Sequence, residues 1–138
     1  MKLPKTFSVA LTVLLVSAAI SQARLGENLK DLKRRYGQPI DAENSSEAGT
    51  SHYTFRWYSY QVAVIVHDGM SVSETFTRND RKEFSLSDVQ DLLVESSDPG
   101  LSWKQTDGST WRQQDRVATW SARTLTVEEK ARAMGRKR

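Results

Sequence analysis

Two stretches of alternating residues constrain the fold of this chain more than any other feature. From residue 52 to 57, aromatic side chains alternate with polar ones, and from 60 to 66 (YQVAVIV) a tyrosine and three valines take every second position. A period of two is typical of β-strands with one face on a core and the other in water. Because only Tyr58-Ser59 separates the two runs, the sequence predicts an antiparallel hairpin with one apolar face.

The loop after this hairpin decides which residues of the third strand (70–76) share the apolar face. A three-residue loop with Gly69 in the left-handed position sets Val64 opposite Val72 and Val62 opposite Glu74. A two-residue turn sets the valines opposite serines and a threonine instead, and such a slip exchanges the two faces of a strand. We therefore expect the three-residue loop.

In that register Glu74 is the only carboxylate on an otherwise apolar face. A buried, unpaired charge is costly, so the Glu74 carboxyl should be paired, hydrogen-bonded or protonated. Two interpretations stay open. Glu74 is either a structural residue at a strand edge, reaching water or a tyrosine hydroxyl, or a ligand-binding or catalytic carboxylate.

Two helices are predicted from apolar spacing and end signals. The first spans residues 28–36 and ends at Gly37, which suits a left-handed C-terminal cap and is soon followed by Pro39. The second begins at Ser85, with Asp88 as its capping-box partner, and runs to about residue 96. The side chains expected to face the core are Leu25, Leu29, Leu32 and Tyr36 in the first helix and Leu86, Val89, Leu92 and Leu93 in the second.

The remaining elements complete an α+β fold. The polar segment 41–51 is expected to be a mobile loop, and residues 110–114 and 117–121 to form a hairpin around Asp115-Arg116. Leu125 and Val127 can extend the sheet, and Thr126 with Glu129 can cap a short tail helix before the basic end of the chain. The expected order is helix, three-strand meander, helix and hairpin, which describes a two-layer sandwich of an antiparallel sheet with helices packed on one face. No internal repeat is evident.

Tryptophans are the candidate ligand-contacting residues. The turn at Asp115-Arg116 sets Trp111 directly opposite Trp120, on a face shared with small alanines. Aromatic pairs of this kind contribute about 0.5–1.5 kcal/mol beyond their burial. The pair is either a core contact under the second helix or, with Trp103, a platform for a sugar, which requires exposed rings.

The N-terminal segment has the pattern of a secretory signal. Lys2 and Lys5 precede the apolar run 7–20, and Ser21-Gln22-Ala23 supplies small residues at a cleavage site. The run is shorter than the ~20 residues of a membrane-spanning helix, although an uncleaved anchor is the alternative. The expected organisation is a signal peptide (1–23), one α+β domain (24–127) and a basic tail (128–138), in a secreted or periplasmic protein.

Cysteine and charge limit the partners. The sequence has no cysteine, so the chain has no disulfides and is not a lipoprotein, which needs a cysteine at its cleavage point. Residues 24–122 carry 12 basic and 15 acidic side chains, which argues against a nucleic-acid-binding face. The basic end 132–138 (RAMGRKR) allows weak contact with an anionic membrane or an acidic partner, at ~1 kcal/mol per basic residue near a charged membrane.

The helix that ends in Tyr36-Gly37-Gln38-Pro39 before a meander resembles small secreted bacterial envelope proteins. It is similar to the small lipoprotein of the outer-membrane β-barrel assembly machinery and, in fold, to β-lactamase-inhibitor-like proteins. The resemblance covers roughly residues 25–76, and the chain departs from it by lacking the lipid-bearing cysteine. It implies a non-catalytic binding role and transfers no functional residues.

Few reactive arrangements are available to this sequence. His52 and His67 are the only histidines and have no short-spaced ligand motif, and the chain contains neither a phosphate-binding loop nor a G-x-S-x-G motif. We therefore expect no metal and no cofactor. The leading hypothesis is a non-enzymatic module that binds a protein or an envelope component. The alternatives are a glycan-binding protein using its tryptophans and, third, a carboxylate-dependent hydrolase around Glu74.

The first testable prediction concerns export. We expect the mature chain to begin at Arg24, because Ser21 and Ala23 are the last small residues before the charged region. Intact-mass analysis of the protein exported by its native host measures this directly. A mass that retains residues 1–23 would contradict cleavage and favour the anchored alternative.

Overall fold

The computed structural model describes residues 25–98 and 100–130, so the expected signal segment and residues 131–138 of the expected tail lie outside the described part of the chain. The described residues form one antiparallel sheet of eight strands and two helices. The elements are α1 (Leu29–Tyr36), β1 (Asp41–Asn44), β2 (Thr50–Trp57), β3 (Tyr60–His67), β4 (Met70–Arg78), α2 (Leu86–Glu95), β5 (Lys104–Asp107), β6 (Thr110–Gln113), β7 (Arg116–Ser121) and β8 (Thr124–Glu129).

The sheet is built from two similar halves. The strand order is β1-β2-β3-β4-β8-β7-β6-β5, so each half is a helix followed by four strands that pair in chain order. The last strands of the halves, β4 and β8, pair antiparallel over five residue pairs centred on Thr75 and Thr126, whose hydroxyls share a hydrogen bond of 3.0 Å. We call this β4–β8 pairing the seam. It joins the halves into one continuous sheet.

The expected order of helix, three-strand meander, helix and hairpin is therefore wrong, although the class remains α+β. The polar segment 41–51 contains strand β1, which pairs with β2 at the sheet edge. All four residues of β1 are exposed, as are all four of β5 at the opposite edge. An edge strand of this kind is held by backbone hydrogen bonds and buries neither of its faces. Its sequence therefore shows no alternation of apolar and polar residues.

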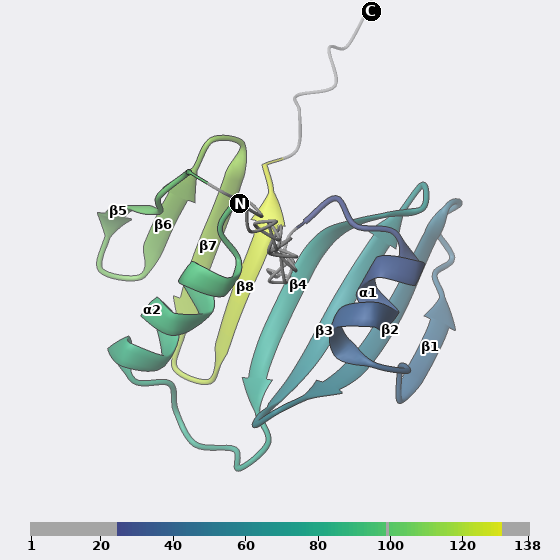
Figure 1. The fold of residues 1–138 in the computed structure, drawn as a ribbon, viewed down its shortest axis with the longest axis horizontal. Coiled ribbons are helices and arrows are strands. Elements are labelled where there is room, and N and C mark those ends of the chain that lie inside the picture. Colours follow the sequence, from purple (N-terminus) through teal and green to yellow (C-terminus); the bar gives the residue numbers. More distant parts are fainter. Residues whose placement is uncertain (1–24, 99, 131–138) are drawn as a thin grey trace, which may run out of the picture.

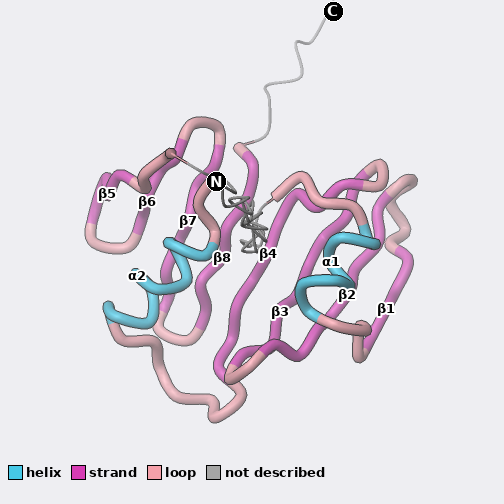
Figure 2. Tube along the Cα trace, in the orientation of Figure 1, coloured by secondary structure: helices cyan, strands magenta, loops and turns pink. Residues whose placement is uncertain are grey.

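Both helices lie on the same face of the sheet, α1 over the half made of β1 to β4 and α2 over the half made of β5 to β8 (Figures 1 and 2). Their starts follow the sequence prediction. The Asn28 side chain accepts a hydrogen bond from the Asp31 amide, and Ser85 with Asp88 forms a complete capping box. Gly37 caps α1 with φ at 86°, a value that side-chain-bearing residues adopt at a cost.

The core lies between the helices and the sheet. Its fully buried side chains alternate along the central strands and face the helices, as the period of two predicts. Leu86 is the exception among the predicted core residues, because 50% of its side chain is exposed at the start of α2. The buried apolar residues are Leu25, Leu32, Tyr36, Phe55, Val62, Val64, Val66, Phe76, Phe84, Val89, Leu92, Leu93, Trp111, Ala118, Leu125 and Val127.

The hairpin of β3 and β4 turns differently from the sequence prediction. The loop is a two-residue Asp68-Gly69 turn with His67 paired to Met70, and both turn residues have positive φ, as a type I′ turn requires. A β-bulge then shifts the register at Val72. The extra residue Val72 leaves Glu74 and Phe76 on the core face, opposite Val64 and Val62. The expected pairing of Val64 with Val72 is therefore wrong, and Met70 and Val72 stay outside the buried core.

The hairpin of β6 and β7 is shifted by two residues from the expected pairing. Gln113 pairs with Arg116 and the turn is Gln114-Asp115, so Trp111 lies opposite Ala118. A shift of two keeps every side chain on its face. The rings of Trp111 and Trp120 are therefore diagonal neighbours, with centroids 6.5 Å apart.

The tryptophan pair gives a prediction about stability. Trp111 is only 5% exposed, whereas Trp120 is partly buried. Trp111→Ala should lower the free energy of unfolding by about 3–5 kcal/mol through the cavity it leaves, and Trp120→Ala by less. Thermal unfolding followed by circular dichroism should show the Trp111→Ala midpoint at least ~10 °C below wild type. The exposed neighbour Thr119 serves as control, since Thr119→Ala should cost only about 0.5 kcal/mol.

Candidate functional site

Glu74 lies on the inner face of β4 and is 1% exposed. It pairs with Val64 on β3 and with Val127 on β8, so it occupies a central strand rather than the sheet edge considered from the sequence. The Tyr36 hydroxyl donates a hydrogen bond of 3.3 Å to Glu74 Oε2, and Arg35 Nη1 lies 3.8 Å from Oε1. Both partners come from the last turn of α1.

The pKa of the Glu74 carboxyl is raised from its ordinary value of 4.5 to about 7. Burial is the main cause, because it disfavours the charged form. Arg35 counteracts it, the charge on Glu27 adds to it, and the hydrogen bond from Tyr36 lowers the pKa again. A carboxyl that titrates near neutral pH can act as a general acid or base only where substrate reaches it.

A second arginine ties the two halves together near Glu74. Arg116, at the start of β7, donates a hydrogen bond of 3.1 Å to the Leu25 carbonyl through Nη2, and its Nη1 lies 3.1 Å from Asp98 Oδ1. Arg35 in turn forms an ion pair with Glu27. These residues, with Glu74, form one cluster that we call the seam cluster. Glu74 lines neither of the two cavities described below.

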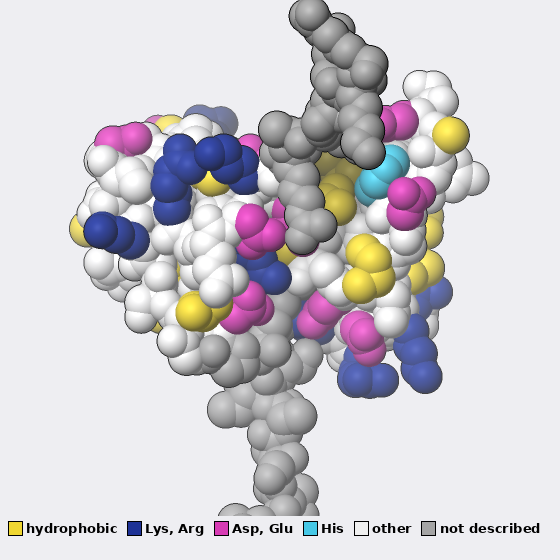
Figure 3. All heavy atoms as spheres, turned by 90° about the horizontal axis from the view of Figure 1, so that it is seen from above, with side chains coloured by type: hydrophobic (Ala, Val, Ile, Leu, Met, Phe, Trp, Pro, Cys, Tyr) yellow, Lys and Arg dark blue, Asp and Glu magenta, His cyan; other side chains and the backbone are white. Residues whose placement is uncertain are grey.

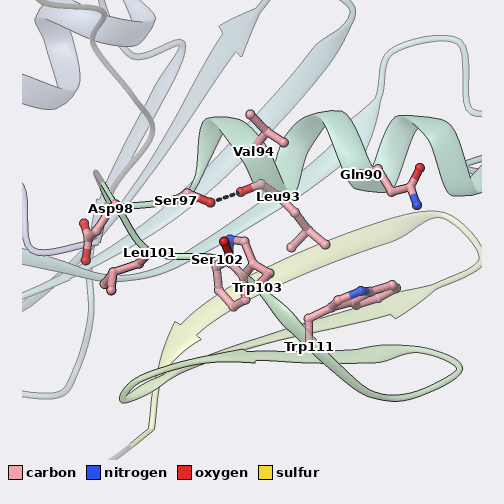
Figure 4. A pocket seen from close by; sticks show the side chains of 10 residues that line it. Gln90, Leu93, Val94, Ser97, Asp98, Leu101, Ser102, Trp103 and Trp111 are labelled. Atoms are coloured by element: carbon pink, nitrogen blue, oxygen red, sulfur yellow. Dashed lines mark hydrogen bonds between the residues drawn. The ribbon is translucent and has the colours of Figure 1, made fainter.

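The first cavity, of about 480 Å³, brings two of the three candidate tryptophans together. Figure 4 shows Trp103 and Trp111 below Leu93 of α2, with Ser97 and Ser102 at the side. Trp111 is buried at the floor and Trp103 is partly buried. Trp120 does not line this cavity. The tryptophans therefore make a packed wall in this cavity rather than an exposed platform.

The second cavity is an open groove of about 880 Å³ that no sequence pattern predicted. It lies at the end of β3, β4 and β8, and its lining includes both apolar and acidic side chains. No sequence signal points to this groove, because it depends on the pairing of β4 with β8, which sets Ser73 opposite Glu128. The lining residues are Gly26, Ile65, His67, Met70, Val72, Ser73, Asp115, Glu128, Glu129 and Lys130.

The two histidines do not come together in a metal site. His67 Nδ1 lies 2.8 Å from the Thr50 hydroxyl and Nε2 lies 3.5 Å from Asp68 Oδ2. His52 pairs with Ile65 further along β2. Within the described ranges, no group of three or more His, Asp or Glu side chains is arranged to hold a metal ion.

Comparisons with known proteins bear only on the fold. No family model and no curated protein matches the chain. Its fold is similar to the crystal structure of a cysteine-rich secretory protein from Staphylococcus aureus, with a TM-score of 0.50 and 15% sequence identity. The match covers 77% of this chain and 44% of that protein, so the chain spans less than half the length of the structure it matches.

The helices also bear on membrane topology. Across residues 25–98 and 100–130, neither helix combines the length and the apolar character required to span a bilayer.

The seam cluster gives a prediction about pH. A carboxyl whose pKa rises on folding contributes stability that is fully present below its unfolded pKa and is lost as pH rises through its folded pKa, here from 4.5 to about 7. The wild-type protein should therefore lose up to about 3 kcal/mol from this group between pH 4.5 and pH 8. Glu74→Gln cannot titrate, so its free energy of unfolding should fall less over that window.

Urea unfolding of both proteins at pH 5 and pH 8 measures the difference. The control is Glu43→Gln, which removes an exposed carboxylate on β1 and should keep the wild-type pH dependence. Equal pH dependence of wild type and Glu74→Gln would contradict the raised pKa.

Proposed function

We propose that this protein is a non-enzymatic binding module of the secreted or periplasmic space that recognises another protein or an envelope component. One observation carries the proposal. Both helices cover the same face of an eight-stranded sheet, and among the described residues no element covers the other face (Figure 1). We call this the open face. It offers a partner an uncovered surface that crosses the strands of the described sheet.

The open face is polar at its centre. Along β4 and β8, the residues that alternate with the buried ones are short hydroxyl side chains, and they flank the hydrogen-bonded pair Thr75 and Thr126 at the seam. Ala63 lies opposite Thr75 on β3 and is exposed. Short side chains with hydrogen-bonding groups let a partner approach the strands closely, which supports recognition over a broad area.

The position of Glu74 supports binding over hydrolysis. Its carboxylate is 1% exposed and already interacts with Arg35 and Tyr36, whereas a catalytic carboxylate must reach its substrate. The tryptophans do not support the glycan alternative either. Stacking on a sugar needs an exposed ring, and Trp111 is 5% exposed within a packed wall.

Capture of a partner tests the proposal. The exported protein, immobilised, is exposed to an envelope extract of its native host, and the bound proteins are identified by mass spectrometry. The double variant Ala63→Arg with Thr75→Arg places two long charged side chains on the open face and should abolish capture of the partner. The matched control is Ser87→Arg on the exposed side of α2, which should capture the partner as wild type does.

The melting midpoints of both variants, measured in parallel, separate lost binding from lost folding. A partner retained equally by wild type, by the folded double variant and by the control would contradict recognition through the open face.

A further inference from the structure

The groove at the end of the open face has an apolar floor. Ile65 on β3 and Met70 and Val72 on β4 line it, and 46% of the Met70 side chain is exposed. Val72 lies at the β-bulge, and a bulge bends its strand and increases the local twist. The register shift keeps Glu74 and Phe76 on the core face, while Val72 lines the groove with Ile65.

Acidic side chains line the groove beside this floor. Asp115 comes from the turn between β6 and β7, and Glu128 and Glu129 end β8. All three are exposed, and none forms an ion pair with another described residue. Figure 3 looks onto this end of the molecule, where hydrophobic side chains lie next to a histidine with acidic side chains nearby. Among the described lining residues, Lys130 is the one lysine or arginine beside these three carboxylates.

We propose that this groove binds a segment of a partner protein in which lysine or arginine side chains accompany apolar ones. The inference rests on the proposed function. It specifies which side chains the partner presents to one end of the open face. Apolar side chains of the segment cover Ile65, Met70 and Val72, which removes apolar surface from water. Its cationic side chains lie against Glu128 and Glu129, where opposite charge speeds association and sets the orientation of the segment.

The charge of the groove also excludes a competing partner. An anionic membrane surface would meet like charge at three unpaired carboxylates, which is unfavourable. Since a protein segment combines positive charge with apolar side chains, it satisfies both parts of the groove.

Fluorescence anisotropy with a defined probe tests the proposal. The probe is a labelled ten-residue peptide of alternating lysine and leucine, titrated with the full exported chain. Two control peptides of equal length separate the effect of charge from that of apolar contact. One alternates glutamate with leucine, and the other alternates lysine with serine. We expect the lysine-leucine peptide to bind at least tenfold tighter than either, and its binding to weaken as salt is added.

Variants of the groove locate the binding. The double variant Glu128→Lys with Glu129→Lys and the single variant Met70→Ser should each weaken binding of the lysine-leucine peptide at least tenfold. The matched control is Asp41→Lys with Glu43→Lys, which makes the same charge change on the exposed edge strand β1. The control should bind within twofold of wild type, and all variants should melt cooperatively.

Four results would overturn the proposal. Equal loss in the β1 control would show long-range attraction rather than a groove, and equal binding of the glutamate-leucine peptide would remove the role of charge. A chain ending at Lys130 that binds more than tenfold tighter than the full chain would assign the groove to residues 131–138 of the chain itself. The variant with Glu128→Lys and Glu129→Lys can also still capture the partner while the lysine-leucine peptide binds to neither protein. That result would refute peptide binding in the groove and leave the proposed function standing.

Discussion

The Glu74 carboxylate lies on the core face of β4 at the seam, opposite Val127 of β8, in a position where water cannot solvate it. An isolated buried charge costs several kcal/mol, so the chain must bring polar partners to it or keep it protonated. Arg35 and Tyr36 supply them from the last turn of α1, and this fixes the helix against β4. Arg116 and Glu27 extend the cluster across the seam to the second half of the sheet.

The placement of both helices on one face agrees with this constraint. Each half of the sheet buries its apolar side chains under its own helix, while the seam continues the same core face from β4 to β8. The opposite face then remains uncovered over all eight strands within the described residues. The module that we propose uses this face because the other face packs against the helices. The groove at its end lies where the bulge at Val72 shifts the register of β4.

The two halves are related in topology, but their sequences conceal it. Counted from the N-caps Asn28 and Ser85, Arg35 and Tyr36 occupy the positions that Leu92 and Leu93 occupy in α2. The last turn of α1 contributes to the charged seam cluster, whereas the same turn of α2 packs in the apolar core. Equivalent positions therefore carry opposite chemistry. A search for repeated residues finds no repeat, whereas the pairing of the strands makes it plain.

The sequence by itself determined the features that depend on neighbours a few residues away. The capping box of Ser85 and Asp88, the end of α1 at Gly37 and the core face of the strands around Glu74 all follow from local hydrogen bonds and a period of two. Only the tertiary structure decided the edge strand β1, the hairpin registers, the seam, the partners of Glu74 and the groove. All of these features depend on backbone hydrogen bonds between segments that are distant in the sequence. Every residue except proline offers the same backbone donor and acceptor, so the sequence says little about which strands such hydrogen bonds join.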